Sequence, residues 1–367
     1  MRTPICDDLG ITHPIFGFTP SQHVAAAISK AGGLGVLGCV RFNDAEELDA
    51  VLDWMDENTD GKPYGVDIVM PAKVPQEGAA TDLSQYIPDE HKHFVEETLR
   101  KLGVPPLPAD GDPRREGVLG WLHSVARSHV DVALKHPIKL IANALGSPPK
   151  DVIDLAHSHG VPVAALAGKA KHARSHVDNG VDIVIAQGTE AGGHTGEIAT
   201  MVLVPEIVDA VSSDAHVLAA GGIGSGRQIA ASLALGAGGV WMGSYWLTTT
   251  EYDLGVGDAM QRALVAAGSD ETVRSRVYSG KPARLLKTKW TEAWTEDGAP
   301  SPLPMPLQNL LVTEAHQRIA AANDPAVVAM PVGQIVGRMN AVRPVAELVA
   351  ELVAEYEETL QRLDKTR

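Results

Sequence analysis

QGTEAGGHTG, the stretch from Gln187 to Gly196, directly follows the short β-branched run GVDIVIA (Gly180 to Ala186). The run is typical of a buried parallel strand, and the four glycines after it allow unusual dihedral angles or close approach to a flat ligand. The same loop carries Gln187, Glu190 and His194. Because α/β enzymes hold their sites in loops at the carboxyl ends of buried strands, a functional loop is one interpretation. A glycine-rich turn with a solvated histidine is the other.

Strands and helices alternate on both sides of this loop. Eight apolar runs predict strands, namely His13–Phe18, Leu34–Leu37, Tyr64–Pro71, Ile138–Ala142, Pro162–Leu166, Asp182–Ala186, His216–Ala219 and Gly239–Met242. A helix generally follows each run, which implies parallel strands with right-handed crossovers, and eight such strands close a barrel. The sequence therefore predicts an α/β fold, a (β/α)8 TIM barrel over residues 1–244, with the QGTEAGGHTG loop after the sixth strand.

The alternation breaks at residues 73–137 and again after residue 244. The first stretch is polar and proline-rich, and its segments HKHFVEETLRKLG and VLGWLHSVARSHVDVALKH have helical periodicity. They predict a helical insertion after the third strand, with a lid or a partner surface as alternative roles. Residues 245–340 predict a small, mainly helical C-terminal module, and residues 341–367 a helix packing back on the barrel. Solvated helix faces are expected for five histidines of the insertion: His91, His93, His123, His129 and His136.

Composition limits the class of protein. Apolar residues make up 44% and aromatic residues 4%, so an aliphatic core is expected. A net charge of -15 argues against nucleic acid or an anionic membrane as a general partner. The N-terminus has no apolar signal core and no run reaches ~18 apolar residues, so a cytoplasmic location is expected. Cys6 and Cys39 lack metal spacing and are expected to be small buried hydrophobes, and no metal site is predicted.

Two further glycine-rich loops indicate a phosphate site. AGGIGSGRQ (Ala220 to Gln228) and MGS (Met242 to Ser244) follow the seventh and eighth predicted strands, where (β/α)8 barrels commonly bind phosphate through backbone amides. Ser244 can donate a hydroxyl, Arg227 can add charge, and Gln187 can meet the polar edge of a flat ring. FMN fits these features, although the spacing does not distinguish it from another phosphorylated ligand.

Four segments resemble the nitronate monooxygenase family, formerly called 2-nitropropane dioxygenases. They are AGGLGVLG (Ala31 to Gly38), YGVDIVMP, QGTEAGGHTG and AAGGIGSGRQIAASLALGAGGVWMGS, and VGQIVG (Val332 to Gly337) matches loosely. The family includes FMN-dependent enoyl-acyl-carrier-protein reductases and NADH:quinone reductases as close relatives. Three features depart from its pattern: the strand-one exit GFTPS, the long insertion, and Asp67 where the third strand usually ends in Asn.

The resemblance implies a cofactor and a catalytic residue. His194 matches the family's active-site histidine, with Gly193 beside it on the substrate side. FMN contacts are implied at Phe18, Thr19, Asp67, Gln187, Gly192, Ala220, Gly221, Gly222, Gly243 and Ser244.

The function expected from this site is oxidation of nitronates or nitroalkanes by dioxygen to a carbonyl compound and nitrite. His194 would act as general base toward a neutral nitroalkane, whereas Glu190 is expected to accept hydrogen bonds from loop amides. An NAD(P)H-dependent FMN reductase of a quinone or an enoyl thioester is the alternative enzyme. A non-catalytic barrel that binds a phosphorylated ligand is the alternative from another class. The use of NAD(P)H and the formation of a homodimer stay open.

Overall fold

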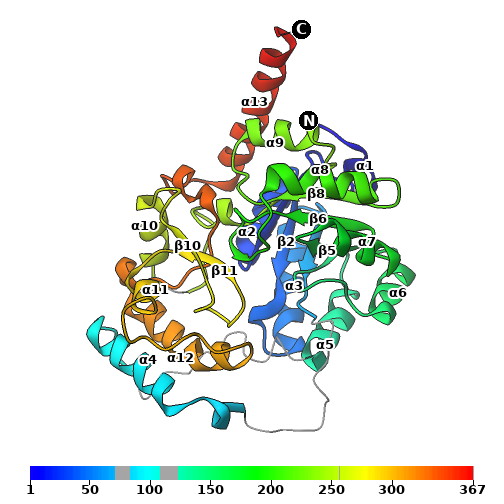
Figure 1. Cartoon of the computed structure of the whole chain (residues 1–367). Helices are drawn as coiled ribbons and strands as arrows, with labels where there is room; N and C mark the ends of the chain where they lie inside the picture. Colours follow the sequence, from blue (N-terminus) through cyan, green and yellow to red (C-terminus); the bar gives the residue numbers. More distant parts are fainter. Residues whose placement is uncertain (71–82, 108–122, 256, 367) are drawn as a thin grey trace.

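The computed structural model describes residues 1–70, 83–107, 123–255 and 257–366 (Figure 1). Eight parallel strands form a closed barrel in the order β1-β2-β3-β4-β5-β6-β8-β9, and the β1–β9 pair closes it with Ile15 opposite Val240. The strands are β1 (Ile15–Thr19), β2 (Leu34–Gly38), β3 (Tyr64–Asp67), β4 (Ile141–Asn143), β5 (Val163–Ala167), β6 (Ile183–Gln187), β8 (His216–Ala220) and β9 (Gly239–Met242). The predicted TIM barrel is confirmed, although the third strand ends at Asp67 and not at Pro71.

Helices surround the barrel and bury their apolar faces against it. They are α2 (Gln22–Lys30), α3 (Ala45–Asn58), α5 (His123–Ala133), α6 (Lys150–Ser158), α7 (Ala170–Asp178), α8 (Thr200–Val211), α9 (Gly226–Ala234) and α13 (Val345–Asp364), and α1 (Pro4–Leu9) precedes β1. The last of them, α13, packs between α9 and α2, and its far end projects from the body of the molecule (Figure 1). Of the helices described, none is long and apolar enough to cross a bilayer.

The barrel interior is filled mainly by aliphatic side chains, as the composition predicts. Trp241 is the main exception, and its ring stacks on Phe16 and Phe18 at centroid distances of 6.4 and 6.2 Å. Successive strand residues face opposite sides. Because Val66 packs with the helix layer, Asp67 lies on the interior side of β3. Both cysteines, Cys6 and Cys39, are fully buried, as expected.

The segment predicted as one insertion divides into two parts with different neighbours. Helix α4 (Asp89–Lys101) packs against α12 (Leu307–Ala322), where the Arg318 guanidinium donates to the Glu96 carboxylate at 2.9 Å. Helix α5 instead packs against α3 and takes the place of the barrel helix after β3. Both helices are docked on the body. Residues 71–82 and 108–122 lie outside the described chain, so the lid and partner-surface roles stay predictions.

Two histidines of this segment correct the expectation of solvated helix faces. His129 is fully buried and its Nε2 lies 3.1 Å from the Asp44 carbonyl oxygen, because α5 is pressed against the start of α3. The His136 side chain is only 7% exposed. His93 is exposed, as predicted, and half-buried His91 contacts the Ser301 carbonyl oxygen. The side chain of His123 lies outside the described part of the structure.

The C-terminal module contains a small sheet as well as helices. Helices α10 (Ala259–Ala266), α11 (Lys289–Ala293) and α12 accompany the hairpin of β10 (Thr272–Ser275) and β11 (Ala283–Leu286). The two-residue strand β7 (Gly193–His194), from the loop after β6, joins this sheet in the order β10-β11-β7. The hairpin was not predicted, because its polar residues do not alternate with apolar ones.

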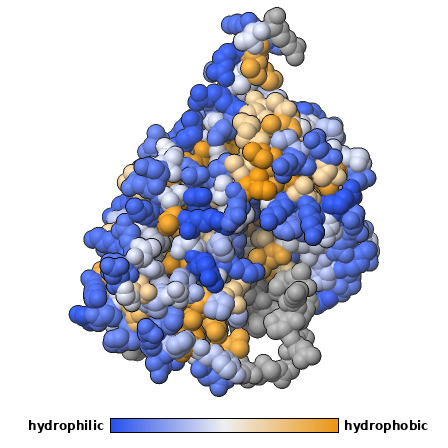
Figure 2. Space-filling model, viewed as in Figure 1, coloured by the Kyte–Doolittle hydropathy of each residue, from blue (hydrophilic) through white to orange (hydrophobic). Residues whose placement is uncertain are grey.

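The face drawn in Figure 2 is mainly hydrophilic and carries several apolar areas, one of them in the region of α8. In that helix Met201 and Val202 are 64% and 51% exposed.

Candidate functional site

The predicted site residues lie at the carboxyl ends of the barrel strands or shortly after them. They are Phe18 and Thr19 of β1, Asp67 of β3, Gln187 of β6, Gly192, Gly193 and His194 in the next loop, Ala220 of β8 with Gly221 and Gly222, and Gly243 and Ser244 after β9. In a closed parallel barrel these ends form one rim. The fold therefore brings together residues that are up to 226 positions apart (Phe18 to Ser244).

Glu190 holds the loop after β6 against the start of α8. Its carboxylate accepts hydrogen bonds from the Thr200 amide and the Thr200 hydroxyl, both at 2.9 Å. An acidic side chain at a helix N-terminus satisfies free amides and interacts favourably with the helix dipole. The expected structural role of Glu190 is confirmed.

His194 is held by the C-terminal module. Its backbone pairs with Ala283 of β11, and its Nε2 lies 2.6 Å from the hydroxyl oxygen of Ser279. The Ser279 side chain is almost fully buried, so this contact is shielded from solvent. Sequence reasoning missed Ser279, because it lies 85 residues from His194 and only the β7–β11 pairing shows that the two meet.

Burial and a neighbouring cation keep the His194 ring neutral. Burial, and to a smaller extent the positive charge of Lys281, together lower its pKa to about 4. The Ser279 hydroxyl carries no charge that would offset these effects. At neutral pH the site therefore presents an uncharged imidazole beside an exposed ammonium group.

Asp67 is a buried carboxyl group at the interior rim. Its exposure is 3%, and its Oδ1 has no hydrogen-bond partner among the described residues. Burial raises its pKa to about 7, and the Ala144 amide only partly opposes this. A buried polar oxygen without a partner is costly, and at a functional site it indicates a missing ligand group.

The loop between β8 and α9 has the backbone that a phosphate loop requires. Gly221 and Gly222 have φ values of 104° and 70°, which side chains with a Cβ rarely adopt. The Gln228 side chain fixes the loop by donating to the Gly222 carbonyl and accepting from the Gly224 amide. After β9, the Ser244 hydroxyl accepts from the Gly333 amide at 2.9 Å.

Arg227 forms an ion pair with the last helix. Its Nε donates to the Glu355 carboxylate of α13 at 2.7 Å, and the Gly226 amide donates to the same group at 2.8 Å. The charge of Arg227 is therefore paired with Glu355 at the surface, and its contribution to a phosphate site stays a prediction.

Gly192 and Gly193 of the QGTEAGGHTG loop lack a side chain for different structural reasons. A Cβ on Gly192 would lie 2.8 Å from backbone atoms of Val332 and Gly333, so this position is glycine because two backbones meet there. A Cβ on Gly193 would meet nothing within 4 Å, and its φ is 74°. Open space for a ligand is thus found beside Gly193, whereas at Gly192 the direction that a Cβ would take is occupied by the C-terminal module.

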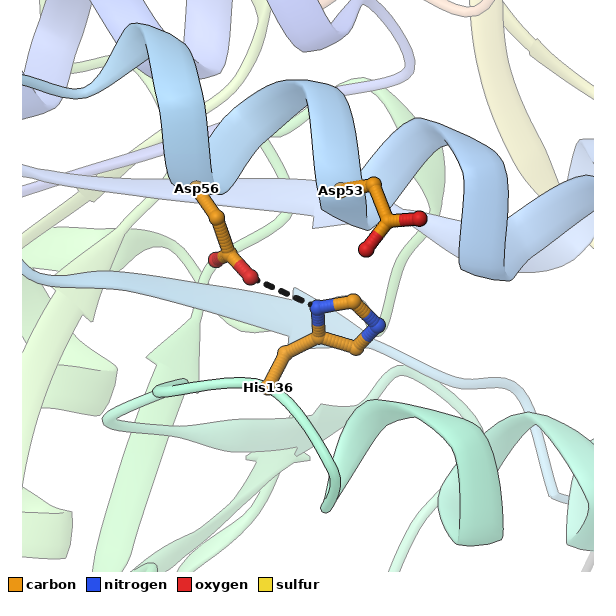
Figure 3. Close-up of side chains that lie close together, drawn as sticks. All are labelled: Asp53, Asp56 and His136. Carbon is orange, nitrogen blue, oxygen red and sulfur yellow. Dashed lines mark hydrogen bonds and ion pairs between the residues drawn. The ribbon is translucent and has the colours of Figure 1, made fainter.

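A second cluster of titratable groups lies at the opposite, N-terminal end of the strands (Figure 3). The His136 Nδ1 lies 2.8 Å from the Asp56 carboxylate and its Nε2 lies 3.0 Å from the Asp49 carboxylate. The Tyr64 hydroxyl donates to Asp56 at 2.6 Å, and Asp53 also faces the ring. Burial alone would lower the pKa of His136, but the hydrogen bonds to Asp56 and Asp49 outweigh it and raise the pKa.

This cluster has the residue types of a metal site, but its hydrogen bonds are those of a protonated histidine paired with carboxylates. Ligand atoms of Asp53, Asp56 and His136 lie within 4.8 Å of one another. Both imidazole nitrogens are already paired with carboxylates, which favours the doubly protonated ring, and that form has no lone pair for a metal. We therefore interpret the cluster as an imidazolium that links α3 to the segment before β4.

The fold and the rim residues define a class, the TIM-barrel oxidoreductases with a histidine loop after the sixth barrel strand. A family model described as nitronate monooxygenase matches residues 5–355. The chain belongs to the nitronate monooxygenase family, and it is an enzyme, an oxidoreductase.

Individual relatives cover nearly the whole chain. A protein named "Putative monooxygenase Rv1533" from Mycobacterium tuberculosis is 48% identical over 99% of this chain and 98% of its own length. A "Probable nitronate monooxygenase" from Staphylococcus aureus is 26% identical over 96% and 97%. A Mycobacterium tuberculosis dehydrogenase named for an indene-carboxyl-CoA substrate is 32% identical over 80% and 68%.

Solved structures show the same architecture. The nitroalkane oxidase of Streptomyces ansochromogenes has a TM-score of 0.79 and 29% identity, with 98% of this chain and 99% of that chain covered. FabK of Thermotoga maritima has a TM-score of 0.74 and 26% identity over the full length of both chains.

Proposed function

We propose that this enzyme oxidises nitronates with dioxygen, with FMN bound at the carboxyl ends of the barrel strands. The observation that carries the proposal is the neutral His194 ring beside the positive charge of Lys281. A nitronate is an anion, so the ammonium group attracts it and the uncharged imidazole can hydrogen-bond its nitro oxygens. The products would be a carbonyl compound and nitrite.

The same observation favours the nitronate over the neutral nitroalkane. Oxidation of a nitroalkane requires removal of its α-proton, and His194 is the group that we assign to take it. The ring is unprotonated and ready to act as a base, but a pKa of about 4 makes it a weak one. A nitronate has already lost this proton and does not need the base.

The residues of the rim fit FMN. The unpartnered Oδ1 of Asp67 calls for a polar ligand group, and the positive φ of Gly221 and Gly222 exposes backbone amides. We assign the ring side to Phe18, Thr19, Asp67, Gln187 and Gly192, and the phosphate side to Ala220, Gly221, Gly222, Gly243 and Ser244. When bound, FMN supplies the electron-accepting chemistry that the side chains lack.

The experiment that tests this proposal is an absorption spectrum of the purified enzyme under anaerobic conditions. The flavin bands should be present and should bleach on addition of a nitronate. Admission of air should restore them and release nitrite. A flavin that a nitronate does not bleach would contradict the proposal, and a colourless protein that takes up no FMN would favour a non-catalytic phosphate-binding barrel.

A second candidate is an NAD(P)H-dependent FMN reductase acting on a quinone or an enoyl thioester. The relative named for a carboxyl-CoA substrate supports it, because that protein shares 32% identity with this chain. Anaerobic bleaching by NADH or NADPH, without bleaching by a nitronate, would favour the reductase.

A further inference from the structure

We propose that Asp67 is a neutral carboxylic acid in the FMN complex and donates its proton in a hydrogen bond to an acceptor atom of the flavin ring. FMN binding would then be coupled to the uptake of one proton from solvent whenever Asp67 starts ionised. The inference rests on the proposed use of FMN and adds to it a defined protonation state. It concerns the position at which this chain departs from the family's usual Asn.

The position of Asp67 points its side chain at the candidate flavin site. It is the last residue of β3 and lies opposite Gly38 of β2 and Ala142 of β4. Its neighbour Val66 packs with the helix layer, so the Asp67 side chain faces the barrel interior at the rim. The rim is where the ends of the other barrel strands present Gln187 and Ala220.

The surroundings of Asp67 disfavour its ionised form. Asp67 is only 3% exposed, and one of its carboxyl oxygens has no partner among the described residues. Burial is the largest influence on its pKa, the Ala144 amide opposes it, and no cation of the described chain contributes. A carboxyl group in such surroundings is stabilised by keeping its proton.

Among the residues that the structure describes, the groups on the elements next to Asp67 do not supply a compensating charge. Cys39, which follows β2, is fully buried, and burial raises the pKa of its thiol, so the thiol stays neutral. Asn143 of β4 is neutral and uses its amide group on Met70 and Gly146. Arg41 reaches away to the Gln22 side chain at 2.7 Å.

A neutral acid and a carboxylate would recognise different atoms of a flavin. The pyrimidine edge of the ring has carbonyl oxygens and ring nitrogens that accept hydrogen bonds, and one N–H that donates. A protonated Asp67 donates to an acceptor, and this contact is lost when the proton leaves. An ionised Asp67 would instead accept from the N–H, and binding would then improve as the pH rises. The direction of the pH dependence distinguishes the two.

The test is a titration of FMN-free protein with FMN between pH 6 and pH 9, followed by flavin fluorescence. For the parent, Kd should rise above pH 7, approaching about tenfold per pH unit. The matched variant Asp67→Asn keeps a hydrogen-bond donor that does not titrate, so its Kd should change much less. Because the FMN phosphate titrates equally with both proteins, the ratio of the two Kd values isolates Asp67.

A second measurement uses the unmodified protein and does not depend on the folding of a variant. Calorimetry at pH 8 in two buffers of different ionisation enthalpy should show uptake of close to one proton per FMN bound. A Kd that falls as the pH rises, proton release, or equal pH profiles for parent and Asp67→Asn would each overturn the inference. Failure to bind FMN at every pH would instead overturn the cofactor assignment itself.

Discussion

Two histidines at opposite ends of the barrel differ in every respect that sets their charge. His194, at the carboxyl ends of the strands, contacts an uncharged hydroxyl, and burial together with the charge of Lys281 lowers its pKa to about 4. His136, at the amino ends, lies between two carboxylates, and its pKa is raised.

This difference indicates that the two ends of the barrel have different roles, with the proposed reaction at one end and stabilising contacts at the other. At the rim that holds the candidate flavin site, the neutral ring of His194 is the group that the proposed function assigns to a substrate. At the other end, both ring nitrogens of His136 are paired with carboxylates, which favours its protonated form and leaves no nitrogen for a ligand. This agrees with the general division of (β/α)8 barrels into a functional carboxyl end and a stabilising amino end.

Replacing His194 should have the largest effect on activity. In His194→Asn we expect kcat/KM for a neutral nitroalkane to fall by about 10²-fold or more, because the proton acceptor is gone. For a preformed nitronate the fall should be below about tenfold, since only a hydrogen bond changes. Oxygen uptake with both substrate forms measures the two effects, and retained flavin absorbance serves as the control. Equal losses with both forms would remove His194 from the role of base.

Breaking the His136 cluster should affect stability and leave chemistry unchanged. Asp56→Ala removes acceptors used by His136 and Tyr64, and we expect a loss of about 2 kcal/mol in the free energy of unfolding. The matched control is Asp154→Ala, which breaks an exposed pair with Lys150 and should cost less than about 1 kcal/mol. Urea unfolding measures both. A fall in kcat for Asp56→Ala would contradict the proposed separation.

Removing the Ser279 hydroxyl should have a smaller effect than removing His194. In Ser279→Ala we expect kcat for a nitroalkane to fall by about tenfold, because the ring loses its orienting partner at Nε2. KM should change little if Ser279 acts only through His194. Ser279→Thr retains the hydroxyl and should recover most of the loss. Similar kcat values for the alanine variant and the parent would show that β7–β11 pairing alone positions the ring.

The pH dependence of stability should differ in sign for the two histidines. The raised pKa of His136 stabilises the fold fully below its unfolded value near 6.5, and this contribution is lost as the pH rises through the folded pKa. The lowered pKa of His194 contributes stability above 6.5 that is lost as the pH falls through about 4. Unfolding of the parent, Asp56→Ala and His194→Asn at pH 4.5, 6 and 8 tests both directions. Parallel profiles for the parent and Asp56→Ala would show that His136 carries no charge in the fold.

Local sequence signals predicted the barrel and its rim. The eight strands were found because short apolar runs alternate with helical periodicity, and the strand count placed His194 beside the two glycine loops. Glu190 was expected to accept hydrogen bonds from loop amides, and in the structure it accepts from the Thr200 amide.

Contacts between distant segments could not be predicted in this way. Ser279 meets His194 across 85 residues, and His136 meets Asp56 across 80. The isolated helical pattern of residues 118–136 also gave no sign that α5 would pack on α3 and bury His129. In each case the contact depends on tertiary packing, and the periodicity within one segment carries no information about which distant segment will pack against it.

The position of α13 has a consequence for the order in which the protein is made. The eighth barrel strand ends at Met242, yet the helix between α9 and α2 spans Val345–Asp364, and β11, which holds His194, begins at Ala283. When all eight barrel strands have left the ribosome, α13, which fills the space between α9 and α2, has therefore not yet been made. The same is true of β11, the strand that pairs with His194. We expect the nascent chain to need a chaperone or a delay in folding while the stretch from Met242 to Asp364 is made, since an open barrel exposes apolar surface.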